Sequence, residues 1–283
     1  MDMRARPYRS VLYIPGSKGR ALDKARSLPV DAIIMDLEDA VSVDEKPNAR
    51  ATLAAALAEG GYGARMRIVR INGLDTEWGQ DDARAANEME CDAVLLPKVE
   101  TTEQLDALAA LTDKLLWAMM ETPKGMLNAA AIAAHPKLAG MVMGTNDLAK
   151  ELQCRFRPDR LPMATSLGLC LLAAKAHGTI IVDGVYNAFK DEDGLRAECE
   201  QGRDMGFDGK TLIHPAQIDI ANAAFAPTDA ETDLARRQIA AFEEAHAEGQ
   251  GVAVVDGRIV ENLHIVTARE ILAKADAISA LNG

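Results

Sequence analysis

The sequence predicts an α/β protein folded as a closed (β/α)8 TIM barrel with a C-terminal helix–hairpin–helix lid. Three observations support this fold class. Eight short apolar segments alternate with helical patterns along the chain. The apolar segments are continuous rather than alternating, which is typical of parallel strands covered on both faces. A length of 283 residues is normal for a barrel of eight such units.

Each predicted strand is a short apolar run bounded by turn or charged residues. The runs cover residues 11–15, 32–35, 66–71, 93–96, 115–120, 141–143, 179–182 and 210–213. Helices are predicted from about residue 20, over 47–58, 77–89 and 102–111, between 121 and 141, and over 163–176 and 192–205. An open, doubly wound sheet is the alternative, but no Gly-x-Gly-x-x-Gly follows the first strand.

The chain continues beyond the predicted barrel, which spans residues 1–226, into a lid segment over residues 227–283. Residues 229–248 have an amphipathic helical pattern. Asp256-Gly257 between two short apolar runs predicts a hairpin, and a final helix is predicted over about 263–281. This unit is small for an independent domain, so we expect it to pack on its own barrel or on a neighbouring subunit.

Composition and charge exclude several classes of partner. A net charge of −12 makes nucleic acid an unsuitable partner. No stretch has the length of a membrane span, and the N-terminus lacks the apolar run of a signal peptide. The cysteines are scattered, without the spacing of metal ligands. We therefore expect buried thiols, a cytoplasmic protein and a small-molecule substrate.

Polar side chains gather where the predicted strands end, which is the face of a barrel that carries the active site. They are Glu38, Asp39, Arg70, Lys98, Glu121, Asp147 and Asp183.

Glu121 and Asp147 follow two neighbouring predicted strands. Such strands lie about 4.8 Å apart, so the two carboxylates could share one small cation. Two carboxylate oxygens and open positions suit Mg²⁺, which keeps water and takes further ligands from its substrate. The alternative is that both residues only cap the helices that follow them.

Seven short motifs resemble the citrate lyase β subunit-like branch of the HpcH/HpaI aldolase superfamily. They are Arg9-Ser-Val-Leu-Tyr-Ile-Pro-Gly, Asp36-Leu-Glu-Asp-Ala-Val, Ile68-Val-Arg-Ile-Asn, Leu96-Pro-Lys-Val-Glu, Glu121-Thr-Pro-Lys-Gly, Gly144-Thr-Asn-Asp-Leu-Ala and Phe207-Asp-Gly-Lys-Thr-Leu-Ile-His-Pro. The resemblance covers nearly the whole chain. This branch contains malyl-CoA, β-methylmalyl-CoA and citramalyl-CoA lyases and malyl-CoA thioesterases.

The resemblance implies a barrel that holds Mg²⁺, or Mn²⁺ in its place, at Glu121 and Asp147. It also implies that Arg70 polarises the acyl carbonyl, and a fixed guanidinium does stabilise a developing oxyanion. An ion pair of Arg70 with Glu38 or Asp39 is the alternative role, and it could also orient the guanidinium. We therefore include both acids among the catalytic candidates.

The substrate of this branch carries coenzyme A, and the resemblance implies two binding regions for it. Backbone N–H groups of Gly144, Thr145 and Asn146 would hold the substrate carboxylate. Lys18 and Lys24 would bind the phosphates of coenzyme A. The alternative for either lysine is an ordinary surface position.

The tail departs from the family pattern at one catalytic position. Lyases of this branch carry an aspartate in a Gly-x-Met-Ile-Asp-x-Pro-His stretch, where this chain reads Gly257-Arg-Ile-Val-Glu-Asn-Leu-His. Glu261 therefore replaces the aspartate, and Leu263 replaces the proline. The resemblance implies a homotrimer or homohexamer in which the lid acts on a neighbouring barrel. Alternatively, Glu261 caps the final helix.

These observations predict a Mg²⁺-dependent enzyme that cleaves or hydrolyses a β-hydroxyacyl-CoA such as (S)-malyl-CoA. The altered tail and compact length put the lyase and thioesterase reactions on an equal footing. The alternatives are a citramalyl-CoA or citryl-CoA lyase, a pyruvate-type class II aldolase that does not use coenzyme A, and a non-catalytic binding subunit.

Overall fold

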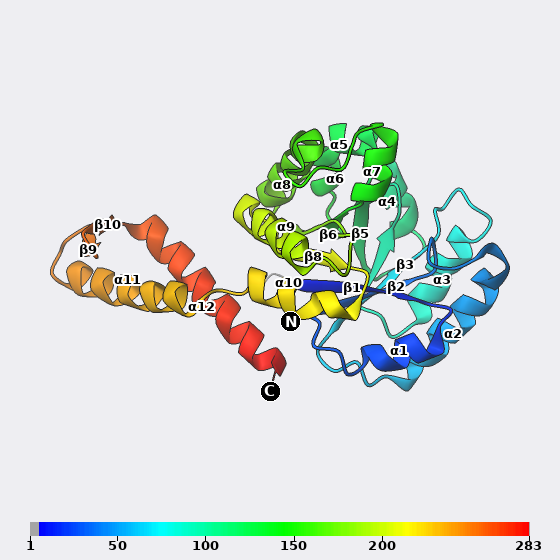
Figure 1. Cartoon of the computed structure of the whole chain (residues 1–283), viewed down its shortest axis with the longest axis horizontal. Coiled ribbons are helices and arrows are strands. Elements are labelled where there is room, and N and C mark those ends of the chain that lie inside the picture. The colour runs from blue at the N-terminus through cyan, green and yellow to red at the C-terminus, as the bar shows by residue number, and fades with distance from the viewer. Residues whose placement is uncertain (1–5, 283) are drawn as a thin grey trace. The chain divides into compact units, whose positions relative to one another are not determined.

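The computed structural model describes residues 6–282 and divides after Phe225 into two compact units. The first unit begins at Tyr8 and is a closed barrel of eight parallel strands surrounded by helices (Figure 1), which confirms the predicted fold class. The strands are β1 Ser10–Pro15, β2 Ala32–Asp36, β3 Met66–Arg70, β4 Ala93–Leu96, β5 Leu115–Met120, β6 Leu138–Met143, β7 Ile180–Asp183 and β8 Gly209–Leu212. Strand β1 pairs with both β2 and β8, which closes the barrel.

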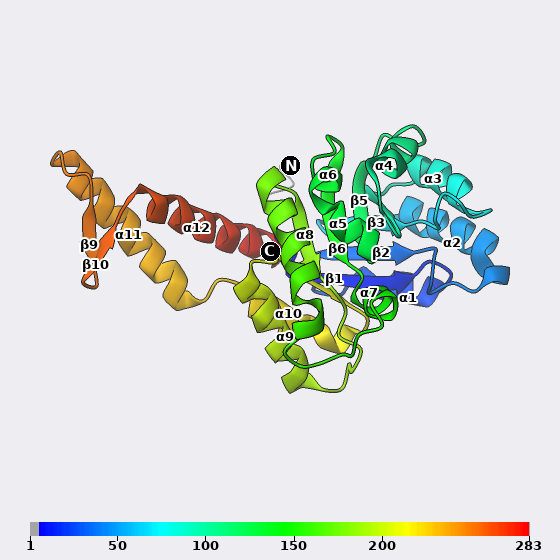
Figure 2. The same ribbon diagram turned by 90° about the horizontal axis from the view of Figure 1, so that it is seen from above.

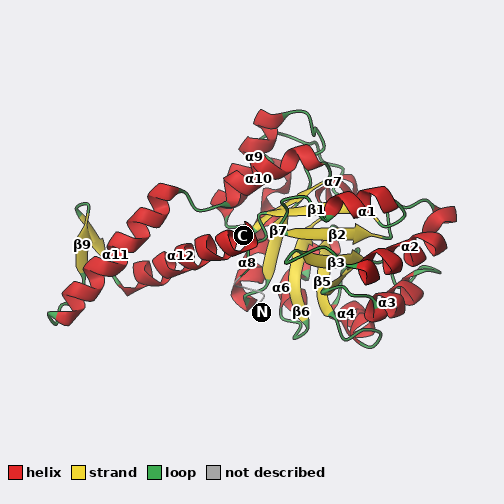
Figure 3. Cartoon of the chain, turned by 90° about the horizontal axis from the view of Figure 1, so that it is seen from below, coloured by secondary structure: helices red, strands yellow, loops and turns green. Residues whose placement is uncertain are grey.

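Helices cover the outside of the strands, as the red ribbons around the yellow strands in Figure 3 show. They are α1 Gly19–Ala25, α2 Lys46–Glu59, α3 Gly79–Glu88, α4 Thr102–Ala109, α5 Pro123–Leu127, α6 Ala129–Ala133, α7 Thr145–Glu151, α8 Ala164–His177, α9 Glu192–Met205 and α10 Ile218–Phe225. Three 3-10 turns, Val43–Glu45, Leu161–Met163 and Pro215–Gln217, precede α2, α8 and α10.

The structure departs from the predicted helices in two respects. The single helix expected between residues 121 and 141 is broken at Asn128, whose side-chain amide donates to the Glu100 carbonyl at 2.8 Å. Helix α10 was not predicted, and α7 was considered only as the helix that Asp147 would cap in the alternative role of that residue.

The barrel strands are buried on both faces, as their continuous apolar sequences require. Trp117 of β5 is fully buried and packs against Tyr8, with ring centroids 5.6 Å apart. A Cβ on Gly140 of the neighbouring strand β6 would lie 2.3 Å from this indole. Glycine is therefore required at residue 140 to admit the tryptophan ring.

The second unit runs from Ala226 and contains α11 Asp229–Ala247, β9 Ala253–Val255, β10 Arg258–Val260 and α12 Asn262–Asn282. Helices α11 and α12 pack against each other, with the hairpin at one end (Figure 2). Asp256 and Gly257 both have positive φ, of 50° and 74°, as the predicted tight hairpin turn requires. None of the described helices is both long and apolar enough to cross a membrane.

Candidate active site

A cavity of about 300 Å³ brings together seven of the predicted site residues at the carboxyl ends of the strands. Those seven are Asp39, Arg70, Glu121, Gly144, Thr145, Asn146 and Asp147. Four further polar or sulfur-containing residues line the same cavity without having been predicted to form part of the site: Tyr13, Asp36, Met119 and Met143. The strand ends therefore converge as the barrel model predicted.

Arg70, the last residue of β3, is held by three carboxylates. Asp36 accepts hydrogen bonds from its Nε at 2.7 Å and its NH2 at 2.6 Å. NH1 lies 2.9 Å from Glu38 Oε2 and 3.4 Å from Asp39 Oδ2. The Tyr13 ring packs against the guanidinium, with Arg70 Cζ 5.1 Å from the ring centroid. Burial disfavours the charged guanidinium, but its hydrogen bonds to the Asp36 carboxylate keep the pKa of Arg70 well above its usual value.

Glu121 follows β5 and is 3% exposed. Its Oε1 accepts a 2.8 Å hydrogen bond from the backbone N–H of Lys98, which has a left-handed φ of 49°. A Cβ on Gly144 would lie 2.5 Å from Glu121 Oε2. Because Thr122 caps α5 instead, accepting from the Gly125 N–H, Glu121 is not the cap of that helix. Helix capping therefore does not account for the burial of the Glu121 carboxylate.

Two carboxylates at this face, the buried Glu121 and the partly buried Glu38, have strongly raised pKa values. Burial, reinforced by the nearby charge of Glu38, raises the pKa of Glu121 to about 8, although the Lys98 N–H lowers it and Asp147 raises it further. Burial also raises the pKa of Glu38 to about 7, against the opposing effect of Arg70. Strongly perturbed pKa values of this kind cluster at functional sites.

Helix α7 begins at Thr145, so Asp147 lies inside its first turn and Gly144 is the N-cap. The Gly144 N–H donates to the Met120 carbonyl at 2.9 Å, and it is therefore engaged within the protein. The N–H groups of a first helical turn have no partner within the helix, so Thr145 and Asn146 are better placed to bind an anion. The Asn146 side chain exchanges two hydrogen bonds with Asn187, at 2.7 and 3.2 Å.

The chemistry of this site fits a hard divalent cation. Glu121 and Asp147 line one cavity, and the charge of Asp147 contributes to the raised pKa of Glu121. Among residues 6–282, no group of three or more His, Cys, Asp or Glu side chains is arranged to hold a metal. Two carboxylates with room for water and substrate oxygens are what Mg²⁺ accepts.

Four predicted site residues do not line this cavity, and one of them, Glu38, lines a larger groove instead. Lys18 is exposed in the loop after β1, with its Nζ 3.3 Å from Glu45. Lys24 is exposed on α1. Glu261 is exposed and immediately precedes α12, and its backbone N–H donates to His264 Nδ1 at 3.0 Å. The structure thus places Glu261 at the N-terminal boundary of the last helix.

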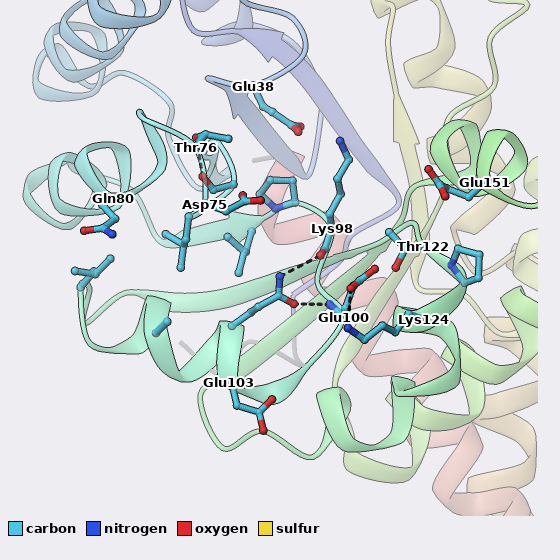
Figure 4. A pocket seen from close by; sticks show the side chains of 18 residues that line it. Glu38, Asp75, Thr76, Gln80, Lys98, Glu100, Glu103, Thr122, Lys124 and Glu151 are labelled. Atoms are coloured by element: carbon cyan, nitrogen blue, oxygen red, sulfur yellow. Dashed lines mark hydrogen bonds and ion pairs between the residues drawn. The ribbon is translucent and has the colours of Figure 1, made fainter.

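A larger groove of about 1120 Å³ lies beside the loops after β3, β4 and β5 (Figure 4). The Lys98 side chain extends toward Glu38 there. Burial lowers the pKa of Lys98, but the carboxylates of Glu38, Glu121 and Asp147 outweigh burial and raise it. The groove also contains Asp75, Glu100, Glu103 and Glu151. This acidic surface is unsuited to the phosphates of coenzyme A.

The prediction that Asp183 joins the other strand-end residues is wrong. Asp183 is fully buried, and a Cβ on Gly202 of α9 would lie 2.9 Å from its Oδ2. Arg160 NH1 lies 2.6 Å and Lys210 Nζ 3.3 Å from the same carboxylate. The resulting ion cluster lies between strand and helix, so Asp183 stabilises the barrel wall.

Comparisons with known proteins agree with this geometry. The chain matches the HpcH/HpaI aldolase/citrate lyase family model over residues 9–215. It is 70% identical to a (3S)-malyl-CoA thioesterase of Cereibacter sphaeroides, over 99% of both chains. It is 34% identical to citrate lyase subunit beta of Escherichia coli, over 96% of this chain and 95% of that protein.

Solved structures extend this similarity to the fold. The protein CitE from Mycobacterium tuberculosis, in complex with magnesium, acetoacetate and coenzyme A, has a TM-score of 0.82 and 30% identity. The match covers 97% of this chain and 99% of that one. The similarity therefore includes the C-terminal unit as well as the barrel.

Proposed function

Because the chain belongs to the HpcH/HpaI aldolase/citrate lyase family, we propose that it is a Mg²⁺-dependent enzyme that hydrolyses (3S)-malyl-CoA to malate and coenzyme A. The observation that carries this proposal is the 70% identity to a thioesterase of that specificity over 99% of both chains. The cavity supports it, because it combines the fixed guanidinium of Arg70 with the carboxylates of Glu121 and Asp147.

Hydrolysis requires water to bond to the thioester carbonyl carbon while a base accepts the water proton. The carbonyl oxygen becomes an oxyanion, and the C–S bond then breaks as the thiolate leaves and takes up a proton. Asp36 holds the Nε–NH2 edge of Arg70. The NH1 side of the guanidinium is therefore the part that would meet the oxyanion.

Glu121 and Asp147 would hold the Mg²⁺, and the donor set fits it as described above. When bound, the metal would stabilise negative charge on substrate oxygens. The backbone N–H groups of Thr145 and Asn146 would bind the substrate carboxylate at the start of α7. Glu38 and Asp39 would hold the NH1 side of Arg70 until substrate arrives.

Coenzyme A would lie toward β1, with Lys18 and Lys24 binding its phosphates. Their exposure supports this role, since a phosphate can reach both ammonium groups. The acidic groove beside β3 to β5 would repel the same phosphates. Neutralising either lysine should weaken binding of coenzyme A in a salt-dependent manner.

The C-terminal unit would supply Glu261 as general base to a neighbouring subunit, in a cytoplasmic homotrimer or homohexamer. The exposure of Glu261 supports this role, because a carboxylate at the end of a hairpin can reach another chain. Mixing inactive Glu121→Ala and Glu261→Ala subunits should restore partial activity. Some sites in the mixed oligomers then combine an intact barrel from one subunit with an intact C-terminal unit from its neighbour. Mixed oligomers that stay inactive would rule out this arrangement.

The test of the proposed reaction is to incubate (3S)-malyl-CoA with the protein and Mg²⁺, and to measure free thiol and glyoxylate separately. We expect one thiol per malate and no glyoxylate. Glyoxylate with acetyl-CoA would assign the aldol lyase reaction instead, for which Arg70 would stabilise the enolate. The proposal is overturned if the protein turns over neither malyl-CoA nor citramalyl-CoA.

A further inference from the structure

Tyr13 places a phenol hydroxyl inside the cavity that contains Arg70 and Glu121. It lies on β1, and its ring is held by the Arg70 guanidinium on one side. The hydroxyl points toward Met119 of β5, two residues before Glu121. Alternate residues of a strand share a face, so Met119 and Glu121 both face the cavity. Tyr13 therefore lines the same cavity as Arg70, Glu121 and Asp147.

The hydroxyl has a poor partner in the protein. The hydrogen bond recorded for it among the described residues is to Met119 Sδ, at 3.9 Å. A thioether sulfur is a weak acceptor. Burial raises the pKa of Tyr13, so the phenol keeps its proton and remains a donor. A donor inside a polar cavity with so weak a partner is available to a ligand.

We infer that the Tyr13 hydroxyl donates a hydrogen bond to the distal carboxylate of the acyl group, and that it selects dicarboxylic acyl groups. This inference rests on the proposed function, because it assumes an acyl-CoA in the cavity. A carboxylate is the strongest acceptor that a malyl group offers to an O–H donor. A site that hydrogen-bonds a substrate group discriminates strongly against acyl groups that lack it.

Calorimetric binding of two non-hydroxylated acyl-CoA esters, with Mg²⁺ present, isolates this contact. Succinyl-CoA carries the distal carboxylate and butyryl-CoA lacks it. Tyr13→Phe removes one oxygen but keeps the ring against Arg70. We expect the Kd for succinyl-CoA to rise about 10- to 100-fold, the scale of a hydrogen bond to a charged group. The Kd for butyryl-CoA should stay within about twofold.

Met119→Leu is the matched control, because it removes the sulfur acceptor and leaves the hydroxyl in place. It should preserve the preference for succinyl-CoA. The inference is overturned if Tyr13→Phe weakens both esters equally or neither, or if Met119→Leu reproduces its effect. Binding does not depend on turnover. A protein that binds succinyl-CoA through Tyr13 but does not hydrolyse malyl-CoA would refute the proposed function and support this inference.

Discussion

The Asp36 carboxylate binds the Arg70 guanidinium through two parallel hydrogen bonds, from Nε at 2.7 Å and from NH2 at 2.6 Å. Asp36 is itself fixed, because it also accepts the backbone N–H groups of Glu38 at 2.9 Å and Ala40 at 3.0 Å. Backbone donors therefore orient an acid that in turn sets the plane of the guanidinium. This support is what makes Arg70 suitable for stabilising an oxyanion.

Arg70→Lys should lower kcat about 100-fold or more, because an ammonium keeps the charge but cannot form the planar pair with Asp36. Steady-state kinetics with malyl-CoA measure this. Arg67→Lys is a matched control on the same strand, since Arg67 pairs with Asp92 away from the cavity, and it should keep normal kcat. A change in KM alone at Arg70 would point to substrate binding without oxyanion stabilisation.

Gly144→Ala should lower activity about 100-fold without unfolding the protein. The new Cβ would lie 2.4 Å from Glu121 Cβ and 2.5 Å from its Oε2, so the carboxylate must move. Displacements near 1 Å in an active site can cost about that factor. Gly168→Ala on α8 is the control, because its Cβ would meet nothing within 4 Å. Equal activity of the two variants would contradict the role of Glu121.

Glu121→Gln and Asp147→Asn should each abolish Mg²⁺-dependent activity and leave the circular dichroism spectrum unchanged. Glu121 directly follows β5 and Asp147 lies in the first turn of α7, and both line the cavity outside the apolar core. Calorimetric titration with Mg²⁺ should show weakened binding in both variants. Wild-type turnover in a buffer with excess chelator would show that the metal assignment is wrong.

Without metal, the protein should lose stability as pH rises. The pKa values of Glu121 and Glu38, about 8 and about 7, are higher than their usual value of 4.5. The folded protein therefore holds these protons more tightly than the unfolded chain. This contribution is fully present below about pH 4.5 and is lost as pH rises through about 8.

Thermal unfolding of metal-free wild type and Glu121→Gln between pH 5 and pH 9 tests this prediction. The amide cannot ionise, so Tm of the variant should fall less across the range. Added Mg²⁺ should raise Tm of the wild type at pH 8, because the metal binds the carboxylate form. If plots of Tm against pH were parallel for the two proteins, ionisation of the buried Glu121 would not be what lowers stability as pH rises.

Asp183→Asn should destabilise the barrel by about 3–5 kcal/mol, because the buried Arg160 and Lys210 would lose the charge of Asp183 and keep only the partly exposed Glu198 as a shared acidic partner. Urea unfolding measures this difference. The control is Asp204→Asn, which breaks a surface pair with Arg203 and should cost under about 1 kcal/mol. Similar losses in both variants would mean that the buried cluster contributes no more than a surface pair.

The sequence by itself determined the eight strands and most of the helices. Continuous apolar runs bury both faces of a strand, and this local pattern needs no knowledge of distant residues. It also identified the polar residues at or just beyond the strand ends, including Glu121, Asp147 and Arg70. The motifs of the chain then indicated the chemistry that this set of side chains supports.

Only the tertiary structure decided which strand-end residues meet. Asp36 and Asp183 are both the last residue of their strands, yet Asp36 faces the cavity and Asp183 faces α9. Successive side chains of a strand point to opposite faces, so a shift of one residue reverses the outcome. The register between neighbouring strands sets that shift, and it depends on contacts between residues far apart in the chain. For the same reason Asp36 was not predicted as the partner of Arg70, 34 residues away.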